Sequence, residues 1–130
     1  MKILGIGNAI VDVICKVDDS FIDQNNLTKS TMKLFFDENE FKNLLTNLKI
    51  EKTVSGGSIA NSIVGISQLG NEVGFIGKIS DDEFGSNYEE GLKKEKVEYF
   101  YSKKKEELPT GTCLISVSYT HLTLPTILLV

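Results

Sequence analysis

The sequence predicts an α/β protein with a largely parallel sheet. Apolar segments of strand length alternate with helix-length stripes over residues 1–117, and glycine-rich breaks separate them. Such alternation is typical of strand–helix–strand units. A chain of 130 residues with 41% hydrophobic and 25% charged residues can also bury a core of its own.

The first strand-like segment, residues 2–17, is predicted to be a strand pair or one long bent strand. Gly5, Gly7 and Asn8 interrupt it, as at a bulge or a close backbone approach. Residues 18–32 are polar and predict a loop, and residues 33–36 predict a short strand. Further strands are expected at residues 73–79, 97–101 and 112–117.

Three helices are expected between these strands. Asp37 opens the first, with Glu40 three residues later as in a capping box. Its apolar stripe has helical spacing: Phe41, Leu44, Leu45 and Leu48. The second follows the Ser55–Ser58 break, contains Ile59, Ile63, Ile66 and Leu69, and stops at Gly70. The third begins at Asp81, with Phe84, Tyr88 and Leu92 four residues apart.

Composition excludes several classes of function. A net charge of −4 gives no electrostatic reason to bind nucleic acid or an anionic membrane. Glu106 and Glu107 follow Lys103–Lys105 directly, so this stretch predicts a solvated loop. There is no C-x-x-C pair and His121 is the single histidine, which argues against zinc. Cys15 and Cys113 are expected to be buried thiols in a reducing cytosol, and no signal peptide or membrane span is recognised.

Two local features could bind a ligand. In Gly56-Gly57-Ser58-Ile59-Ala60-Asn61, paired glycines before a helix allow close backbone approach, and Asn61 can donate and accept hydrogen bonds. The plainer alternative is a loop capped by Ser58. Asp12 lies within an apolar window, where a carboxylate needs partners such as sugar hydroxyls. The plainer alternative is a strand residue that faces solvent.

Two nucleotide-binding motifs are excluded. Gly5-x-Gly7 would need glycine at position 10, where the chain has Ile10. Gly77-Lys78 would need glycine at position 72 and Ser or Thr at position 79 for a P-loop, where Glu72 and Ile79 stand.

Taken together, the segments resemble the PfkB/ribokinase family of kinases over residues 1 to about 117. The resemblance rests on four motifs in family order: Gly7-Asn8-Ala9-Ile10-Val11-Asp12, Gly56-Gly57-x-x-Ala60-Asn61 with Gln68-Leu69-Gly70, Val73 to Gly85, and Pro109-Thr110-Gly111-Thr112.

This resemblance implies a ribokinase-like three-layer α/β sandwich with a small β-sheet lid, built partly from strands near Asp12 and Tyr99–Val117. It implies ATP- and Mg²⁺-dependent phosphorylation of a primary hydroxyl of a sugar or nucleoside, in the cytoplasm. It assigns substrate binding to Asn8, Asp12, Gly56, Gly57 and Asn61. The form Gly-Asn-x-x-x-Asp looks more like adenosine kinases, while fructose-type and ketogluconate-type sugars stay open, as does a homodimer through the lid.

The family's Gly-Ala-Gly-Asp motif, which carries the catalytic base, and its ATP-binding region are absent from this sequence. We therefore expect an N-terminal kinase fragment without catalytic or metal-binding residues; the alternative is a non-catalytic sugar- or nucleoside-binding module. Residues 118–130 contain no Asp, Glu, Lys or Arg, so we expect a tail that is foreign to the gene. Sequencing the genomic locus tests this expectation, since native codons there would contradict it.

Overall fold

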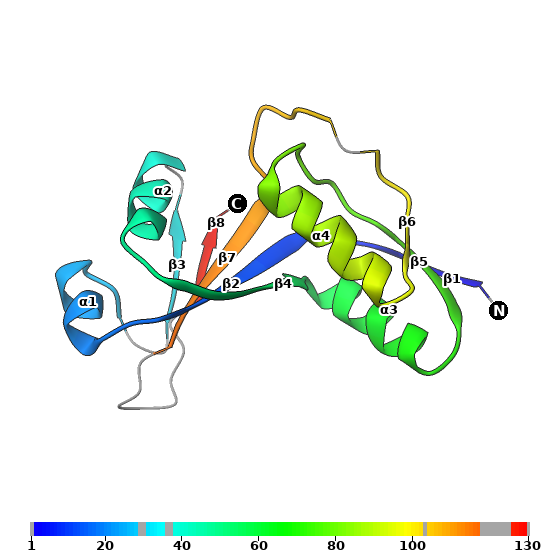
Figure 1. Cartoon of the computed structure of the whole chain (residues 1–130), viewed down its shortest axis with the longest axis horizontal. Helices are drawn as coiled ribbons and strands as arrows, with labels where there is room; N and C mark the ends of the chain where they lie inside the picture. Colours follow the sequence, from blue (N-terminus) through cyan, green and yellow to red (C-terminus); the bar gives the residue numbers. More distant parts are fainter. Residues whose placement is uncertain (1, 29–30, 36–37, 103, 118–125, 130) are drawn as a thin grey trace. The chain divides into compact units, whose positions relative to one another are not determined.

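The computed structural model describes residues 2–28, 31–35, 38–102, 104–117 and 126–129 (Figure 1). The chain divides into two compact units. Unit 1 comprises Met1–Val11 and Val54–Gly111, and unit 2 comprises Asp12–Thr53 and Thr112–Val130.

Unit 1 is built on a three-stranded parallel sheet. Its strands are β1 (Lys2–Ile6), β5 (Glu72–Ile76) and β6 (Glu98–Tyr99), in the order β1-β5-β6. In the register, Lys2 lies opposite Glu72 and Gly74 lies opposite Glu98. Two helices pack against this sheet, α3 (Ser58–Gln68) against β1 and β5, and α4 (Glu83–Lys94) against β6.

The core of unit 1 lies between the sheet and these helices. Phe75 on β5 is fully buried, and its ring centroid lies 6.3 Å from that of Tyr88 on α4 and 6.4 Å from that of Tyr99 on β6. On β1, a Cβ added to Gly5 would lie 2.5 Å from the side chain of Ile63. Glycine on β1 therefore lets α3 lie close to the sheet.

Unit 2 contains most of a five-stranded mixed sheet with the order β3-β8-β7-β2-β4. Strands β3 and β8 are parallel, and β7 and β8 are antiparallel. Val13, Cys15 and Leu114 are fully buried in this unit. The sheet's strands are β2 (Ile10–Lys16), β3 (Met32–Phe35), β4 (Ile50–Gly56), β7 (Gly111–Val117) and β8 (Thr126–Leu129), and the helices of unit 2 are α1 (Asp19–Gln24) and α2 (Glu38–Thr46).

Most of the predicted elements are confirmed. Residues 2–17 form two strands, three of the helices follow the predicted stripes, and Phe41 and Leu44 are buried on α2. Gly70 follows α3 with a φ of +84°, which suits glycine after a helix. Both cysteines are buried, and the two thiols are not joined in a disulfide. The expected capping residue Asp37 lies outside the described residues.

Other expectations are wrong. The predicted loop at residues 18–32 contains α1, whose Ile22 is buried, and β4 was not predicted. The third helix begins at Glu83 with Asp82 as its N-cap, and the strand expected at 73–79 ends at Ile76. Of the strands expected in the lid, β2 and β7 lie in the five-stranded sheet, but Tyr99 belongs to the sheet of unit 1.

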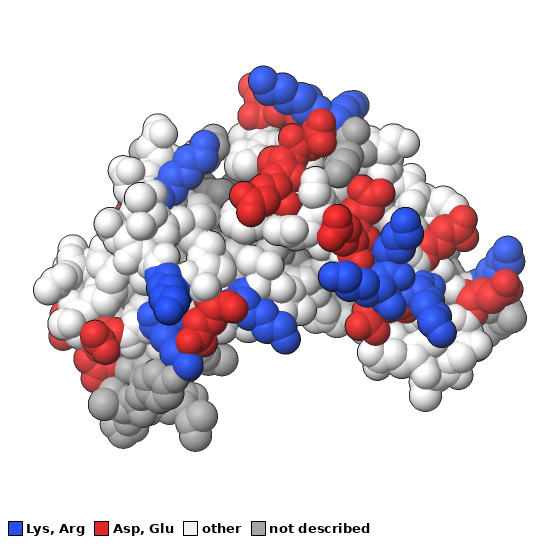
Figure 2. Space-filling model, viewed as in Figure 1, with Lys and Arg blue, Asp and Glu red and all other residues white. Residues whose placement is uncertain are grey.

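The prediction for the tail falls partly outside the described residues, at 118–125. Residues 126–129 form β8, and the foreign origin of the tail stays a prediction. Figure 2 shows lysines and acidic residues mixed over the visible face. No helix in the described ranges is both long and apolar enough for a membrane span.

Candidate functional site

Asn8 and Gly57 lie in direct backbone contact in unit 1. Gly57 has a φ of +98°, which L side chains rarely adopt, and a Cβ added to it would lie 2.5 Å from the carbonyl oxygen of Asn8. Backbone that close leaves room only for glycine. Two segments that the sequence singled out independently are therefore brought together, and the second glycine of the pair is the residue that allows it.

The amino end of α3 begins directly at this contact. Gly57 is the N-cap, and no side chain caps the helix, so the alternative in which Ser58 is the cap is wrong. The Asn61 amide donates to the Gly57 carbonyl at 2.9 Å and so belongs to the helical ladder. The first turn holds no acidic residue, and the Asn8 and Asn61 side chains are exposed. Helix amino ends favour electron-rich groups because their first amides lack intrahelical acceptors.

Hydrogen bonds with α4 hold Gly56 in place. The Tyr88 hydroxyl donates to the Gly56 carbonyl at 3.2 Å, and the Ser55 hydroxyl donates to the Tyr88 carbonyl at 3.0 Å. Gly91 of α4 lacks a Cβ, and this leaves room for the Ser55 side chain that packs against it. These contacts fix the end of β4, and with it the position of the glycine pair.

Asp12 lies in unit 2, on β2. It shares its partly exposed side of the strand with Ile10 and Ile14, whereas Val11 and Val13 are buried. Burial raises the pKa of the Asp12 carboxyl above its ordinary value, and a hydrogen bond from the Cys113 thiol lowers that pKa in part. Asp12 is therefore half-buried and hydrogen-bonded, and it is not a freely solvated strand residue. Sequence reasoning missed Cys113, because only the placement of β7 beside β2 brings it there.

A second group that the sequence did not reveal as a unit lies around Asp82 and Thr110. The Asp82 carboxylate accepts hydrogen bonds from the Gly85 amide at 2.7 Å, the Thr110 amide at 2.8 Å and the Thr110 hydroxyl at 2.7 Å. That hydroxyl also accepts from the Ser80 amide at 3.0 Å. The group fixes Gly111, where an added Cβ would lie 3.0 Å from the Ala9 carbonyl. The motif that contains Asp82 and the motif that contains Thr110 are thus both connected to the segment next to Asn8.

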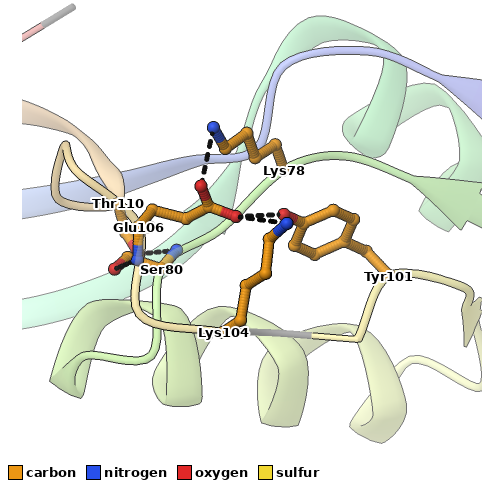
Figure 3. A network of polar contacts seen from close by, with 6 residues as sticks. All are labelled: Lys78, Ser80, Tyr101, Lys104, Glu106 and Thr110. Atoms are coloured by element: carbon orange, nitrogen blue, oxygen red, sulfur yellow. Dashed lines mark hydrogen bonds and ion pairs between the residues drawn. The ribbon is translucent and has the colours of Figure 1, made fainter.

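Glu106 forms the adjoining polar network (Figure 3). Its carboxylate accepts from the Tyr101 hydroxyl at 2.6 Å and pairs with Lys78 at 3.0 Å and Lys104 at 3.7 Å. The hydrogen bond from Tyr101, then the one from Lys78, lowers the pKa of the Glu106 carboxyl. The Glu106 side chain is 12% exposed, so the solvated loop predicted here is wrong at this residue, because its charge is paired.

No group of three or more His, Cys, Asp or Glu side chains within the described ranges could hold a metal ion. The donor set that Mg²⁺ prefers, several oxygens at one point, is therefore not assembled by these residues. The Asn8, Gly57 and Asn61 groups offer amides and carbonyls suited to hydroxyl groups instead.

Comparison with known proteins shows to which family the chain belongs. Residues 2–125 match the family described as "pfkB family carbohydrate kinase". A 5-dehydro-2-deoxygluconokinase from Mesomycoplasma hyopneumoniae is 38% identical over 76 residues, which are 58% of this chain and 22% of that protein. A fructokinase from Escherichia coli is 41% identical over 63 residues, 48% of this chain and 20% of that protein.

Solved structures show the same fold. An adenosine kinase from Sinorhizobium meliloti has a TM-score of 0.79 and 30% identity over 98% of this chain and 39% of its own. A probable sugar kinase from Rhizobium etli has a TM-score of 0.81 and 28% identity over 98% of this chain and 38% of its own. This chain therefore spans about a fifth of the curated relatives and two fifths of the solved ones. With a match over residues 2–125 and a ribokinase-like fold, the chain belongs to the pfkB family of carbohydrate kinases.

Proposed function

We propose that this chain supplies the substrate-binding part of an ATP-dependent kinase that phosphorylates a primary hydroxyl of a sugar or nucleoside. The observation that carries the proposal is the contact of Gly57 with the Asn8 carbonyl at the start of α3. The contact excludes every residue except glycine at position 57, and the side chains of Asn8 and Asn61 beside it are exposed.

In this proposal each residue has a distinct part. The Asn8 and Asn61 amides donate to and accept from the acceptor's hydroxyl groups, and the Gly56–Gly57 backbone lets the sugar ring approach closely. Asp12 accepts hydrogen bonds from two hydroxyls; β2, which carries it, begins two residues after Asn8. Its role is to hold the acceptor and not to remove its proton. Family membership implies ATP as phosphate donor, and the donor's binding residues and Mg²⁺ belong to the portion of the kinase outside this chain.

Two acceptor classes are supported by different observations. The spacing Gly7-Asn8-x-x-x-Asp12 and the S. meliloti adenosine kinase favour a nucleoside. The curated relatives of higher identity favour a sugar acid or hexose. Assaying the full-length enzyme with ATP against adenosine, fructose and 5-dehydro-2-deoxygluconate separates them. Binding of one of these compounds without turnover would favour the non-catalytic binding module instead. Neither turnover nor binding of any of them would contradict the kinase proposal.

A further inference from the structure

Three aromatic rings pack against one another in the core of unit 1. Phe75 of β5 and Tyr88 of α4 are fully buried, and Tyr99 lies beside them on β6. The two tyrosine rings meet edge to face, with centroids 6.1 Å apart, and each lies in contact range of the Phe75 ring. Aromatic pairs at such separations attract one another, so packing sets the direction in which each tyrosine hydroxyl points.

Each tyrosine hydroxyl donates to the carbonyl of a glycine. Tyr88 donates to Gly56 at 3.2 Å, and Tyr99 donates to Gly77. Burial, and after it the nearby Glu89 carboxylate, raises the pKa of the Tyr99 hydroxyl well above its ordinary value. This hydroxyl therefore keeps its proton, and remains a donor, at any pH at which an enzyme is assayed.

Both glycine segments lie against the same short stretch of chain, Gly7–Asn8. A Cβ added to Gly57, which follows the first of these glycines, would lie 2.5 Å from the Asn8 carbonyl oxygen. A Cβ added to Gly77 would lie 2.8 Å from the Gly7 carbonyl oxygen. The Gly7 amide in turn donates to the Ile76 carbonyl at 3.0 Å. Two backbone contacts, each next to a carbonyl that a tyrosine holds, thus fix this stretch.

Water cannot easily replace either tyrosine hydroxyl. Gly56 and Gly77 are both buried, and the Phe75 ring lies where a Cβ of Gly77 would be, 2.6 Å from that position. Loss of one hydroxyl would leave a buried carbonyl without this donor, and such a group is costly. The backbone would then move toward another donor, and the Gly7–Asn8 stretch would move with it.

We propose that Tyr88 and Tyr99 are positioning residues of the acceptor site. Their hydroxyls together fix where Asn8 lies relative to the amino end of α3, and they thereby set the affinity for the acceptor's hydroxyl groups. Each hydroxyl donates its single proton to a glycine carbonyl, so both tyrosines act through the glycines. The inference rests on the proposed function, because it takes Asn8 and Asn61 as residues that bind the acceptor.

The plainer alternative is that the two tyrosines only stabilise the core of unit 1. In that case removal of a hydroxyl lowers the free energy of unfolding and leaves the affinity of the folded enzyme for its acceptor unchanged. If the tyrosines position Asn8, the acceptor is bound less well by an enzyme that is still folded and still binds ATP. The two readings therefore differ in the KM for one substrate and not for the other.

Steady-state kinetics of full-length Tyr88→Phe and Tyr99→Phe enzymes separates these readings, because each change removes a hydroxyl and keeps the ring. The acceptor is whichever of adenosine, fructose and 5-dehydro-2-deoxygluconate the wild type phosphorylates with ATP. Each variant should raise the acceptor KM about 3-fold to 10-fold and leave the KM for ATP within about twofold.

Ser67→Ala is the matched control. The Ser67 hydroxyl also donates to a backbone carbonyl of unit 1, that of Glu95 at 2.8 Å, but it lies at the end of α3 opposite to Gly57. Its removal should leave the KM values for ATP and for the acceptor at those of the wild type.

Hydrogen exchange of the ligand-free full-length enzyme measures positioning without turnover. Tyr88→Phe should speed exchange of the Asn61 amide, which donates to the Gly57 carbonyl, and Tyr99→Phe should speed that of the Gly7 amide. Ser67→Ala should change neither.

Three results would count against the inference. A wild-type acceptor KM in both tyrosine variants would overturn it while the proposed kinase activity stands. Equal increases in the KM for ATP and for the acceptor, with faster exchange throughout unit 1, would overturn it in favour of general destabilisation. A wild type that neither binds nor phosphorylates any of the acceptors would overturn the proposed function itself, and the inference would fall with it before any variant is compared.

Discussion

The hydroxyl group of Thr110 both donates to the Asp82 carboxylate at 2.7 Å and accepts from the Ser80 amide at 3.0 Å. Thr110 is 1% exposed, so both bonds are shielded from water. Through them the start of β7 is fixed to the amino end of α4, next to the Ala9 carbonyl that Gly111 touches.

Thr110→Val is expected to destabilise the full-length enzyme by about 1.5–3 kcal/mol, because a methyl group leaves the buried Ser80 amide and one Asp82 oxygen without this partner. Urea unfolding measures the change. Thr46→Val is the control: the exposed Thr46 hydroxyl donates to Lys42 of the same helix, and its loss should be within about 0.5 kcal/mol of zero. Equal effects of the two substitutions would contradict a structural role for the Asp82–Thr110 pair.

Three glycine substitutions distinguish the energetic cost of a positive φ from the cost of a steric clash. Gly57→Ala should cost the most, about 2–4 kcal/mol, since it combines a positive φ with a clash against the Asn8 carbonyl. Gly70→Ala should cost only about 1 kcal/mol, because its φ is +84° but nothing lies within 4 Å. Gly65→Ala, within α3 and in open space, should stabilise by up to about 1 kcal/mol. Chemical unfolding gives the order, and a Gly57→Ala variant as stable as Gly70→Ala would show that the backbone contact is absent.

Asp12 is expected to make stability depend on pH. Its pKa is raised in the folded chain above the usual 3.8, so between these two values the folded state binds more protons than the unfolded state. The stability that protonated Asp12 contributes is therefore present at low pH and is lost as pH rises through the folded pKa. The free energy of unfolding of the full-length enzyme minus that of its Asp12→Asn variant isolates this contribution, and it should fall between pH 3 and 7. If the free energy of unfolding of Asp12→Asn depends on pH as that of the wild type does, the Asp12 carboxyl is fully solvated.

The isolated 130-residue chain is expected to show no kinase activity and no sharp melting transition. In unit 1 the apolar side chains of Leu4, Ile6 and Phe100 are each more than half exposed. The Gly-Ala-Gly-Asp motif, to which the family resemblance assigns the catalytic base and the groups that stabilise the transferred phosphoryl, is not in the sequence. Calorimetry and a coupled assay with ATP check the two halves separately. A cooperative melt would refute the first half alone, and clean ATP-dependent turnover the second.

Sequence pattern predicted elements with strong apolar stripes and missed those without one. Helix α1 was missed because polar residues surround its single buried residue, Ile22. Strand β4 was missed because it is a sheet edge in which four of the seven residues are exposed, the charged Glu51 and Lys52 among them. Edge strands commonly carry charge to prevent unwanted pairing.

The candidate residues were predictable from motifs, but their contacts were not. Nothing in the sequence shows that Gly57 meets the Asn8 backbone, 49 positions away, or that the Cys113 thiol reaches Asp12, because long-range placement depends on packing of whole elements. The same holds for Glu106: besides Lys104, two residues before it, its carboxylate pairs with the distant Lys78 and accepts from Tyr101.

The measurement that tests the central proposal most directly is steady-state kinetics of the full-length enzyme with Asp12→Ala, varying each substrate in turn. Loss of one or two hydrogen bonds to a charged group, each about 1.5–3 kcal/mol, should raise the acceptor KM about 10-fold to more than 100-fold. The KM for ATP should barely move, and kcat should fall somewhat because the acceptor is held less firmly. Asn61→Ala should show a milder rise, and Asp23→Ala, an exposed carboxylate on α1, should show none. An acceptor KM that stays at the wild-type value in a folded Asp12→Ala enzyme would contradict the account and make Asp12 a structural strand residue.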